Sequence, residues 1–383
     1  MPTTDINKIN WPDGNTTILH DSRCDGVSEA VEAILGGGSV DPNGTVNFYD
    51  YDGKLVYSYT ASKFATLTEM PANPSHDGLA AQGWNWTLSD AKTYVASYGR
   101  LNIGQMYTTS DGKTRLYIAL TEGRTSPILK LTLASGSEVD IDWGDGTTHD
   151  TLSGSGDKTT NRHEYAAAGS YVIAITVSSG SVTIPQYILS NGDPSSSSSS
   201  PDKAYLNAIK KVEIGSSVTS IGNSAFQSCY SLSPITIPSS VTSIGDSAFY
   251  YCSSLSSITI PSSVTSIGSS AFQNGFSLSS ITIPSSVTSI GNSAFRYCSS
   301  LSSITIPSSV TSIGSSAFQN CYSLSSITIP SSVTSIGSSA FSSCYSLATI
   351  NILGKSSGDI SGAPWGASTG SPTYTQIIWE NAQ

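Results

Sequence analysis

The sequence has little charge and few of the residues that catalysis and metal binding use most. Charged residues make up 11% of its 383 positions, and the net charge is −10. Only four histidines occur, namely His20, His76, His149 and His163. None of them has a partner at the spacing of a zinc motif. Residues 232–346 carry only two charged side chains, Asp246 and Arg296, so no basic face is expected there for nucleic acid. These shortages predict a non-catalytic protein with no metal, no cofactor and no nucleic-acid partner.

Long apolar runs are also missing. No run approaches the roughly 20 residues that a membrane-spanning helix needs, so no membrane insertion is expected. Residues 1–8 contain no apolar core of an export signal. We therefore expect either that such a signal was removed or that the protein leaves the cell without one, for example by lysis. In both cases the predicted location is extracellular.

One stretch has the spacing of a catalytic motif. Residues 366–370, Gly-Ala-Ser-Thr-Gly, fit the pattern G-x-S-x-G. In hydrolases the serine of this pattern lies on a turn between a strand and a helix. Here the pattern lies in a loop rich in glycine and serine, so we interpret it as a chance match.

The sequence is rich in repetition instead, because a unit of 23 residues occurs six times over residues 209–346. One copy reads Leu301-Ser-Ser-Ile304-Thr-Ile306-Pro307-Ser-Ser-Val310-Thr-Ser-Ile313-Gly314-Ser-Ser-Ala317-Phe318-Gln-Asn-Cys321-Tyr322-Ser323. A fixed period of this length is typical of a solenoid. Burying the large apolar side chains of one copy is worth roughly 9–18 kcal/mol. Ordering its backbone costs more, at about 1–2 kcal/mol per residue, so the copies have to stack and share a core.

Within each copy the pattern predicts two short strands and a turn. Ser-Ile-Thr-Ile alternates with period two, which indicates a strand whose threonine points outward. Pro307 lacks an N–H and ends this strand. Residues 310–313 form a second alternating stretch, Gly314 follows at a tight turn, and Phe318 enters the core. Six copies at the strand spacing of about 4.8 Å form a ladder about 29 Å long.

These repeats carry a family resemblance. The pattern L-x-x-I-T-I-P-x-x-V-T-x-I-G-x-x-A-F-x-x-C resembles the BspA-like leucine-rich repeat, and six copies keep its register. The resemblance implies a right-handed solenoid that serves in binding, often as a bacterial surface adhesin. It implies no catalytic residues.

Five of the six cysteines recur at one position of the unit: Cys229, Cys252, Cys298, Cys321 and Cys344. One interpretation is a redox or metal ladder, and the other is a small buried apolar side chain. Stacked cysteines would have parallel Cβ vectors, which do not suit a disulfide. A linear row also cannot surround a metal tetrahedrally. We therefore predict buried thiols without a redox or metal role.

Two further units are expected before the repeats, behind a short attachment segment. Residues 1–40 are predicted to hold short strands, a helical stretch at 27–35 and a glycine-rich linker. Residues 45–122 are predicted as a small α+β domain with two hairpins, around residues 52–53 and 111–112. Helices are expected at 62–67 and from Ser89 to Gly99. Trp84 and Trp86 could form a sugar-stacking shelf or pack a core, and we predict the core.

Residues 126–180 are predicted as an immunoglobulin-like β-sandwich. The stretch from Asp140, Asp-Ile-Asp-Trp-Gly-Asp-Gly-Thr, precedes His163-Glu-Tyr165-Ala-Ala-Ala-Gly169-Ser-Tyr171-Val. Their order and spacing resemble the PKD domain, which implies a spacer of extracellular and surface proteins. The aspartates of residues 140–146 could bind calcium or could hold a turn. Because they lack the residue order of an EF-hand, we predict a structural turn.

The remaining stretches are expected to join and to close these units. Residues 181–208 contain a serine run between Pro194 and Pro201, and we predict a flexible linker that ends in the start of a capping coil. Residues 347–383 are predicted as a C-terminal cap, with a strand at 347–353 and with Trp365 and Trp379 covering the open end.

Three positions of the unit vary between copies while most of the others barely change. They are positions 19, 20 and 22, which flank the cysteine position on one edge of the solenoid. Tyrosine, amide and arginine side chains, which recognition surfaces favour, occur there. The candidate binding residues are Tyr230, Tyr250, Tyr251, Phe276, Arg296, Tyr297, Tyr322 and Tyr345. The alternative is that these positions are exposed and free to drift, with some aromatics covering the core.

The order of the units is compatible with three kinds of binding protein. The start Asp-Ile-Asn-Lys-Ile, the stretch from Val46 and the stretch from Gln82 resemble proteins encoded near tail genes of phages and prophages of gut bacteria. This resemblance implies a virion-associated receptor-binding protein whose N-terminal part docks on a tail or baseplate and whose solenoid binds a cell-surface protein or glycan. The first alternative is a BspA-type adhesin on the bacterial cell surface, which binds host matrix protein or other cells. The second is a carbohydrate-binding accessory protein, which would need Trp84, Trp86 and Trp143 on an open shelf.

Overall fold

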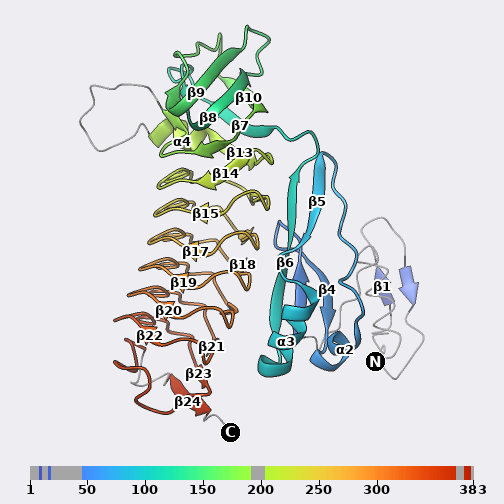
Figure 1. Cartoon of the computed structure of the whole chain (residues 1–383), viewed down its shortest axis with the longest axis vertical. Coiled ribbons are helices and arrows are strands. Elements are labelled where there is room, and N and C mark those ends of the chain that lie inside the picture. Colours follow the sequence, from blue (N-terminus) through green and yellow to red (C-terminus); the bar gives the residue numbers. More distant parts are fainter. Residues whose placement is uncertain (1–7, 11–15, 19–44, 191–202, 368–374, 381–383) are drawn as a thin grey trace, which may run out of the picture.

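The computed structural model describes residues 8–10, 16–18, 45–190, 203–367 and 375–380, and the structural statements below concern these residues. In Figure 1 the coils of a solenoid stack along the long axis, an antiparallel β unit lies at one end of the stack, and an α+β unit lies beside the coils. The predicted mainly β class with a C-terminal solenoid of 23-residue repeats is confirmed.

The six repeat copies form six coils, numbered from coil 1 (209–231) to coil 6 (324–346). One parallel ladder along them joins β14 (Val218–Ile221), β15 (Ser243–Ile244), β17 (Ser266–Ile267), β19 (Ser289–Ile290), β20 (Ser312–Ile313) and β22 (Ser335–Ile336). Other strands of the coils pair in two separate sheets, one of β16 (Ser257–Thr259) with β18 (Ser280–Thr282) and one that contains β21 (Ser326–Ile329) and β23 (Thr349–Leu353). Equivalent residues pair between neighbouring coils, as Ile267 does with Ile290.

Columns of identical side chains fill the solenoid. The phenylalanines of the six coils stack with ring centroids 5.4 to 5.8 Å apart: Phe226, Phe249, Phe272, Phe295, Phe318 and Phe341. The five recurrent cysteines are free and buried, as predicted. Burial raises the thiol pKa, to about 12 at Cys298 and Cys344. These cysteines therefore act as small apolar core residues.

The α+β unit contains β3 (Val46–Tyr49), β4 (Leu55–Tyr59), α2 (Ala61–Thr66), β5 (Leu79–Trp84), α3 (Leu88–Tyr98) and β6 (Leu101–Thr109). Its sheet has the order β4-β3-β6-β5, and the β3–β4 pairing confirms the first predicted hairpin. Helix α3 begins after Thr87, whose hydroxyl accepts a hydrogen bond from the N–H of Asp90 at 3.1 Å. The N-cap is therefore Thr87 and not Ser89. The helix ends at Gly99, which has a left-handed φ of 73°.

The antiparallel unit contains β7 (Thr114–Leu120), β8 (Ile128–Asp142), β9 (Asp150–Thr159), β10 (Gly169–Ser179) and β12 (Leu189–Ser190). Strand β10 lies between β7 and β8, and β13 (Ile209–Glu213) of coil 1 pairs with the other edge of β7. The strands predicted at 129–133 and 138–142 are one strand, β8, with a register shift between Leu133 and Ser137.

The second hairpin predicted for the α+β domain does not form. Residues 111–112 connect β6 and β7, which belong to different sheets. Strand β6 pairs with β3 and β5, while β7 pairs with β10 and β13. Strand β7 is thus paired on both edges, which leaves it no edge for a hairpin with β6. The α+β unit therefore ends with β6 and does not extend to residue 122.

The prediction of a linker over residues 181–208 is wrong for its first part. Strand β11 (Val182–Ile184) pairs with β8 on one side and with β14 of coil 1 on the other. Ile184, Ile188 and Leu189 are fully buried. One sheet consequently runs from the antiparallel unit into the solenoid, and β11 is the rung on which coil 1 stacks. Helix α4 (Lys203–Ala208) leads into coil 1, and the serine run lies outside the described residues.

The aspartate-rich turn uses its carboxylates internally. Asp142 Oδ1 accepts a hydrogen bond from the N–H of Gly144 at 2.9 Å. Asp145 Oδ1 accepts from the N–H and the hydroxyl of Thr147 at 3.1 and 2.7 Å. These contacts agree with the predicted structural turn. Within the described part of the chain, no three histidine, cysteine or acidic side chains gather at one point as metal ligands would.

The C-terminal strand and tryptophan close the open end of the solenoid. Strand β24 (Gln376–Glu380) pairs with β23 in parallel. Trp365 is 2% exposed, and its ring centroid lies 6.4 Å from that of Phe341, the last phenylalanine of the column. The strand expected at 347–353 is present as β23, and Trp365 lies at the end of the phenylalanine column as expected. The serine of the G-x-S-x-G pattern, Ser368, lies outside the described residues.

The leading segment is described only in part. Strands β1 (Lys8–Asn10) and β2 (Thr16–Ile18) pair antiparallel. The predicted helical stretch at 27–35, the glycine run and Cys24 lie outside the described residues. Among the helices that are described, none has both the length and the apolar character that a bilayer crossing requires.

Candidate binding surface

One face of the solenoid is covered by the α+β unit. This face, the threonine face, carries the fifth residue of coils 2 to 6, namely Thr236, Thr259, Thr282, Thr305 and Thr328. The first three are at most 6% exposed. A Cβ atom on Gly104 of β6 would lie 2.2 Å from Thr282 Oγ1. Strand β6 can therefore lie this close to the solenoid only with glycine at position 104. The prediction that the threonines point outward holds, but the chain's own α+β unit keeps three of them from solvent.

Proline explains why this face accepts a partner. In a parallel ladder the carbonyl of a coil's sixth residue would accept from the N–H of the seventh residue on the neighbouring coil. That residue is proline in coils 2 to 6 and has no N–H. Side chains of the α+β unit supply donors to three of these carbonyls, in coils 3, 4 and 5: Asn85 Nδ2 to Ile260 at 3.2 Å, Trp86 Nε1 to Ile283 at 3.1 Å, and the Tyr94 hydroxyl to Ile306 at 2.8 Å.

The contact continues onto the coils at either side. Gln82 Oε1 accepts from the N–H of Ser239 in coil 2 at 2.8 Å. Arg100 Nη2 donates to Thr328 Oγ1 in coil 6 at 2.8 Å. Five consecutive coils are thus hydrogen-bonded to one unit, which takes up much of the threonine face.

The candidate binding residues form a row along a different edge, which we call the aromatic edge: Tyr230, Tyr250, Tyr251, Phe276, Arg296, Tyr297, Tyr322 and Tyr345. Every coil contributes one aromatic side chain at position 20 or 22. Position 22 is serine in coils 2 and 4, as Ser253 and Ser299, and in these two coils position 20 is tyrosine. The row therefore has an aromatic ring on every coil although no single position is always aromatic.

The structure brings four of these residues together over coils 1 to 3. The ring of Tyr251 is the centre of the group, with centroids 6.0 Å from Tyr230, 4.9 Å from Tyr250 and 6.1 Å from Phe276. All three contacts are edge-to-face, the arrangement that aromatic rings favour. Burial, followed by the proximity of Tyr251, raises the pKa of Tyr250.

The other four candidates form two pairs further along the edge. The guanidinium of Arg296 lies over the ring of Tyr297, 5.2 Å from its centroid. Arg296 Nε is buried and has no hydrogen-bond partner among the described residues. Tyr322 and Tyr345 stack with an interplanar angle of 3° and a centroid distance of 5.5 Å. Tyr345 is 62% exposed and Tyr322 and Phe276 are each 39% exposed, so these rings do not serve to cover the core.

Backbone geometry adds a second observation at position 20. The N–H of this residue donates to the carbonyl of position 19 on the next coil, as Tyr251 does to Gln273 at 2.9 Å. The bond occurs in coils 1 to 5, and position 20 lies in the left-handed region in all six coils, with φ between 58° and 63°. Asparagine tolerates that region, whereas tyrosine is strained there. Tyr251 and Tyr297 occupy it nevertheless, and such strain is typical of functional positions.

Sequence reasoning missed the residues that hold the α+β unit to the solenoid. Asn85, Trp86, Tyr94 and Arg100 lie in one stretch, but the sequence shows no pattern that pairs them with carbonyls and a hydroxyl group up to 228 residues away. The alternation of aromatic residues between positions 20 and 22 was present in the sequence and could have been found there.

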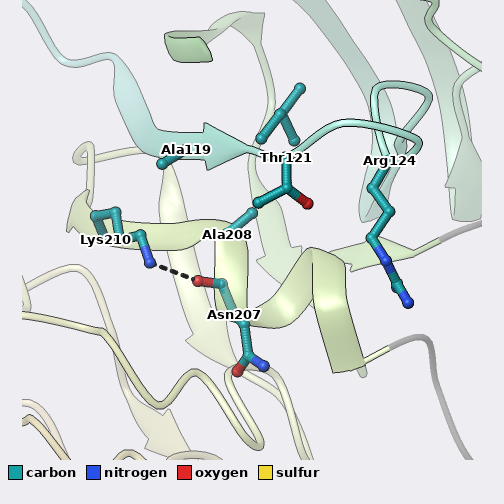
Figure 2. Close-up of a pocket in the computed structure, with 7 residues that line it drawn as sticks. Ala119, Thr121, Arg124, Asn207, Ala208 and Lys210 are labelled. Carbon is teal, nitrogen blue, oxygen red and sulfur yellow. Dashed lines mark hydrogen bonds between the residues drawn. The ribbon is translucent and has the colours of Figure 1, made fainter. Parts of the chain in front are cut away.

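Figure 2 shows a cavity of about 300 Å³ at the joint between the antiparallel unit and coil 1. Its wall is formed by the end of β7, by Thr121 and Arg124, and by the turn from α4 into β13. Lys210 Nζ donates to the carbonyl of Asn207 at 2.9 Å across one side. This contact ties the start of coil 1 together, so we interpret the cavity as part of the joint.

The repeat region matches a known family. Residues 194–302 and 265–361 fit the model described as the BspA type leucine rich repeat region, in six copies. The solenoid of this chain is therefore built of BspA-type leucine-rich repeats, as its pattern predicted. Among curated proteins none matches the chain.

Solved structures with similarity to the chain come from several bacteria. A leucine-rich repeat protein of T. pallidum is 32% identical, with 37% of this chain and 64% of that one covered and a TM-score of 0.30. A leucine rich cell surface protein of Faecalibacterium prausnitzii is 32% identical, with 38% and 49% covered and a TM-score of 0.31. A leucine-rich repeat protein of Bacteroides ovatus is 26% identical, with 46% and 57% covered and a TM-score of 0.31. The chain covers less than two thirds of each of these three structures.

Proposed function

We propose that this chain is a non-catalytic adhesion protein that binds a cell-surface protein or glycan through the aromatic edge. The observation that carries the proposal is the row of six aromatic rings, one on each coil, two of which are kept in a strained backbone conformation. Tyrosine offers a large, rigid contact area together with a hydroxyl group, which suits recognition. Six coils at a strand spacing of about 4.8 Å give a row about 25–30 Å long, which fits an extended partner.

The covered threonine face supports the choice of this edge. The α+β unit occupies the other ladder face over five coils, so it holds the solenoid rigid and leaves the aromatic edge for the ligand. The antiparallel unit would then act as the spacer that the resemblance to the PKD domain implies. This arrangement needs no metal, no cofactor and no nucleic acid.

A binding protein of this kind could belong either to a bacterial cell surface or to a phage tail. A BspA-type solenoid is favoured by the repeat match and points to a secreted or cell-surface adhesin, which would bind host matrix protein or other cells. The resemblance of the N-terminal stretches to phage and prophage proteins points to a tail-associated receptor-binding protein. The carbohydrate-accessory alternative loses its basis, because Trp84, Trp86 and Trp143 are at most 7% exposed and form no open shelf.

Mass spectrometry distinguishes the cell-surface location from the phage-tail location. Purified phage particles of the source strain are compared with washed cell envelopes and culture supernatant. Peptides of this chain at stoichiometric levels in particles would establish the tail-associated role. Peptides confined to the envelope would establish the adhesin.

Binding of the labelled full chain to immobilised collagen, fibronectin and fibrinogen and to intact bacterial cells tests the edge itself. Replacing Tyr250, Tyr251 and Tyr297 together with serine should lower binding at least tenfold while the chain stays folded, as far-UV circular dichroism would show. Val172→Ser, an exposed apolar residue of the antiparallel unit, is the matched control and should bind as the wild type does. Equal binding by the triple variant would refute the aromatic edge as the binding surface.

A further inference from the structure

A polar groove lies where the α+β unit meets the last coils of the solenoid. Two cavities, of about 350 and about 230 Å³, are each lined by both Arg100 and Ser326. Arg100 follows helix α3, and Ser326 begins β21 of coil 6. The two cavities adjoin these same two side chains, and we call the pair of cavities the Arg100 groove. It exists only because the two units are docked, since each contributes one wall.

The groove holds a positive charge that no carboxylate neutralises locally. Arg100 Nη2 donates to Thr328 Oγ1 at 2.8 Å and Nη1 lies 3.5 Å from Ser326 Oγ. Both acceptors are neutral hydroxyl groups. Within the described residues, no aspartate or glutamate lines either cavity. An exposed guanidinium held in this way presents its remaining N–H donors to a ligand, and it binds a carboxylate in a bidentate manner.

The rest of the lining offers hydroxyl and amide groups and one aromatic ring. Asn351 stands at the position of Thr328 on the neighbouring coil, and its Oδ1 atom is buried without a hydrogen-bond partner among the described residues. Asn47 and Asn102 line the other cavity. Tyr98 of α3 forms part of the wall, with its ring 4.2 Å from that of Tyr94. A flat ring beside amides and hydroxyls is an arrangement that suits the apolar and polar faces of a sugar.

We propose that the Arg100 groove binds a carboxylate-bearing sugar unit, such as a uronate residue of an acidic polysaccharide. Arg100 pairs with the carboxylate, and the amides of Asn351 and Asn102 take sugar hydroxyls. Tyr98 lies against the apolar face of the ring. The site is separate from the aromatic edge, and a protein with both would hold a surface polymer at one place and a second partner at another.

The test is calorimetric titration of the full chain at low ionic strength with trigalacturonate, with its methyl ester and with a panel of sialylated and glucuronate-containing oligosaccharides. At least one acidic oligosaccharide should bind, and its methyl ester should bind at least tenfold more weakly because the carboxylate is masked. Raising the salt concentration should weaken the binding of the acidic oligosaccharide and leave the binding of the ester nearly unchanged.

Four variants test the site. Arg100→Gln should lower the affinity at least tenfold, while Lys54→Gln, an exposed lysine of the same unit, makes the same charge change and should leave it unaltered. Asn351→Thr restores the residue found at this position in coils 2 to 6 and should weaken binding severalfold without altering docking. The triple tyrosine-to-serine variant of the aromatic edge should bind these sugars normally, so the two proposals fail independently. Absence of binding to every acidic oligosaccharide, or equal binding by Arg100→Gln, would overturn the inference.

Discussion

The indole N–H of Trp86 donates to the carbonyl of Ile283 at 3.1 Å, across 197 residues of sequence. Trp86 lies just before helix α3, and Ile283 precedes the proline that ends the strand of coil 4. The proline on the neighbouring coil cannot supply an N–H to this carbonyl, so the bond replaces one that the repeat pattern itself removes. It joins the α+β unit and the solenoid into one body and thereby decides which face of the solenoid stays open.

The buried hydroxyl of Tyr94 should contribute to stability through the same kind of contact. Tyr94→Phe keeps the ring and leaves the carbonyl of Ile306 without its donor, so we expect the free energy of unfolding to fall by about 1–3 kcal/mol. Urea denaturation followed by tryptophan fluorescence measures this. Tyr98→Phe removes a hydroxyl from a half-buried ring and should cost less. If both variants lose the same free energy of unfolding, the burial of the Tyr94 hydroxyl against the solenoid does not explain its contribution.

Gly104 should be essential for the close approach of β6 to the threonine face. The added methyl group of Gly104→Ala would meet Thr259 and Thr282 at 2.5 Å and less, so the unit has to move away. We expect a loss of about 1–3 kcal/mol, as for other overpacked sites. Limited proteolysis should detect the loosened unit as faster cleavage around residues 110–113.

Two further variants control this prediction. Gly169→Ala places a methyl group in ordinary contact with Tyr171, at 3.5 Å, and should be nearly neutral. Combining Gly104→Ala with Thr259→Ala and Thr282→Ala makes room for the methyl group and should restore docking. Failure of this rescue would mean that the threonine hydroxyls are not the obstacle.

The strained tyrosines of the aromatic edge should respond differently to replacement by asparagine. Tyr297→Asn relieves a left-handed conformation that costs roughly 1–2 kcal/mol for most residues and loses one cation–π contact worth about 0.5–1 kcal/mol at an exposed site. We expect a small gain in stability. Tyr251→Asn loses three ring contacts of about 0.5–1.5 kcal/mol each and should be destabilised. Thermal unfolding of both variants checks this, and a loss of stability in Tyr297→Asn would contradict the assignment of strain.

The cysteine column should be inert at neutral pH and destabilising in alkali. Burial raises the pKa of Cys298 and Cys344 to about 12, so almost no thiolate is present in the folded protein at pH 8. In a Cys24→Ser background, iodoacetamide should label none of the five recurrent thiols until denaturant is added. Rapid labelling of the native protein would refute their burial.

The stability effect has a definite sign. The folded thiols have a raised pKa, so between about pH 9 and pH 12 the native state binds more protons than the unfolded state. Stability is therefore fully present below about pH 8.5, the pKa of a free thiol, and is lost as the pH rises toward 12. Urea midpoints measured from pH 8 to pH 11 should fall steadily.

The repeat pattern was sufficient to predict the solenoid, because each coil repeats the same residues at the same positions. The period, the strand ended by proline, the phenylalanine entering the core and the buried cysteine all follow from residues within one unit and its neighbours. The aromatic edge was predictable for the same reason: stacking places equivalent positions side by side, so a row in the sequence is a row in space. The tyrosines of position 20 could be read from the sequence, but their left-handed backbone could not, since the side-chain pattern does not give φ.

The sequence by itself determined what neighbouring coils do to each other: the mainly β class, the ladders, the core columns and the position of the aromatic edge. Only the tertiary structure decided which strands of the first 190 residues pair and which face of the solenoid is covered. Strand β7 joins the antiparallel unit although its turn signal pointed to β6, and β11 becomes the first rung although it lies in a stretch that reads as a linker. The physical reason is that these contacts depend on unpaired strand edges and on carbonyls without donors. A local pattern predicts that such groups need a partner, but the partner itself is decided by the packing of residues far apart in the chain.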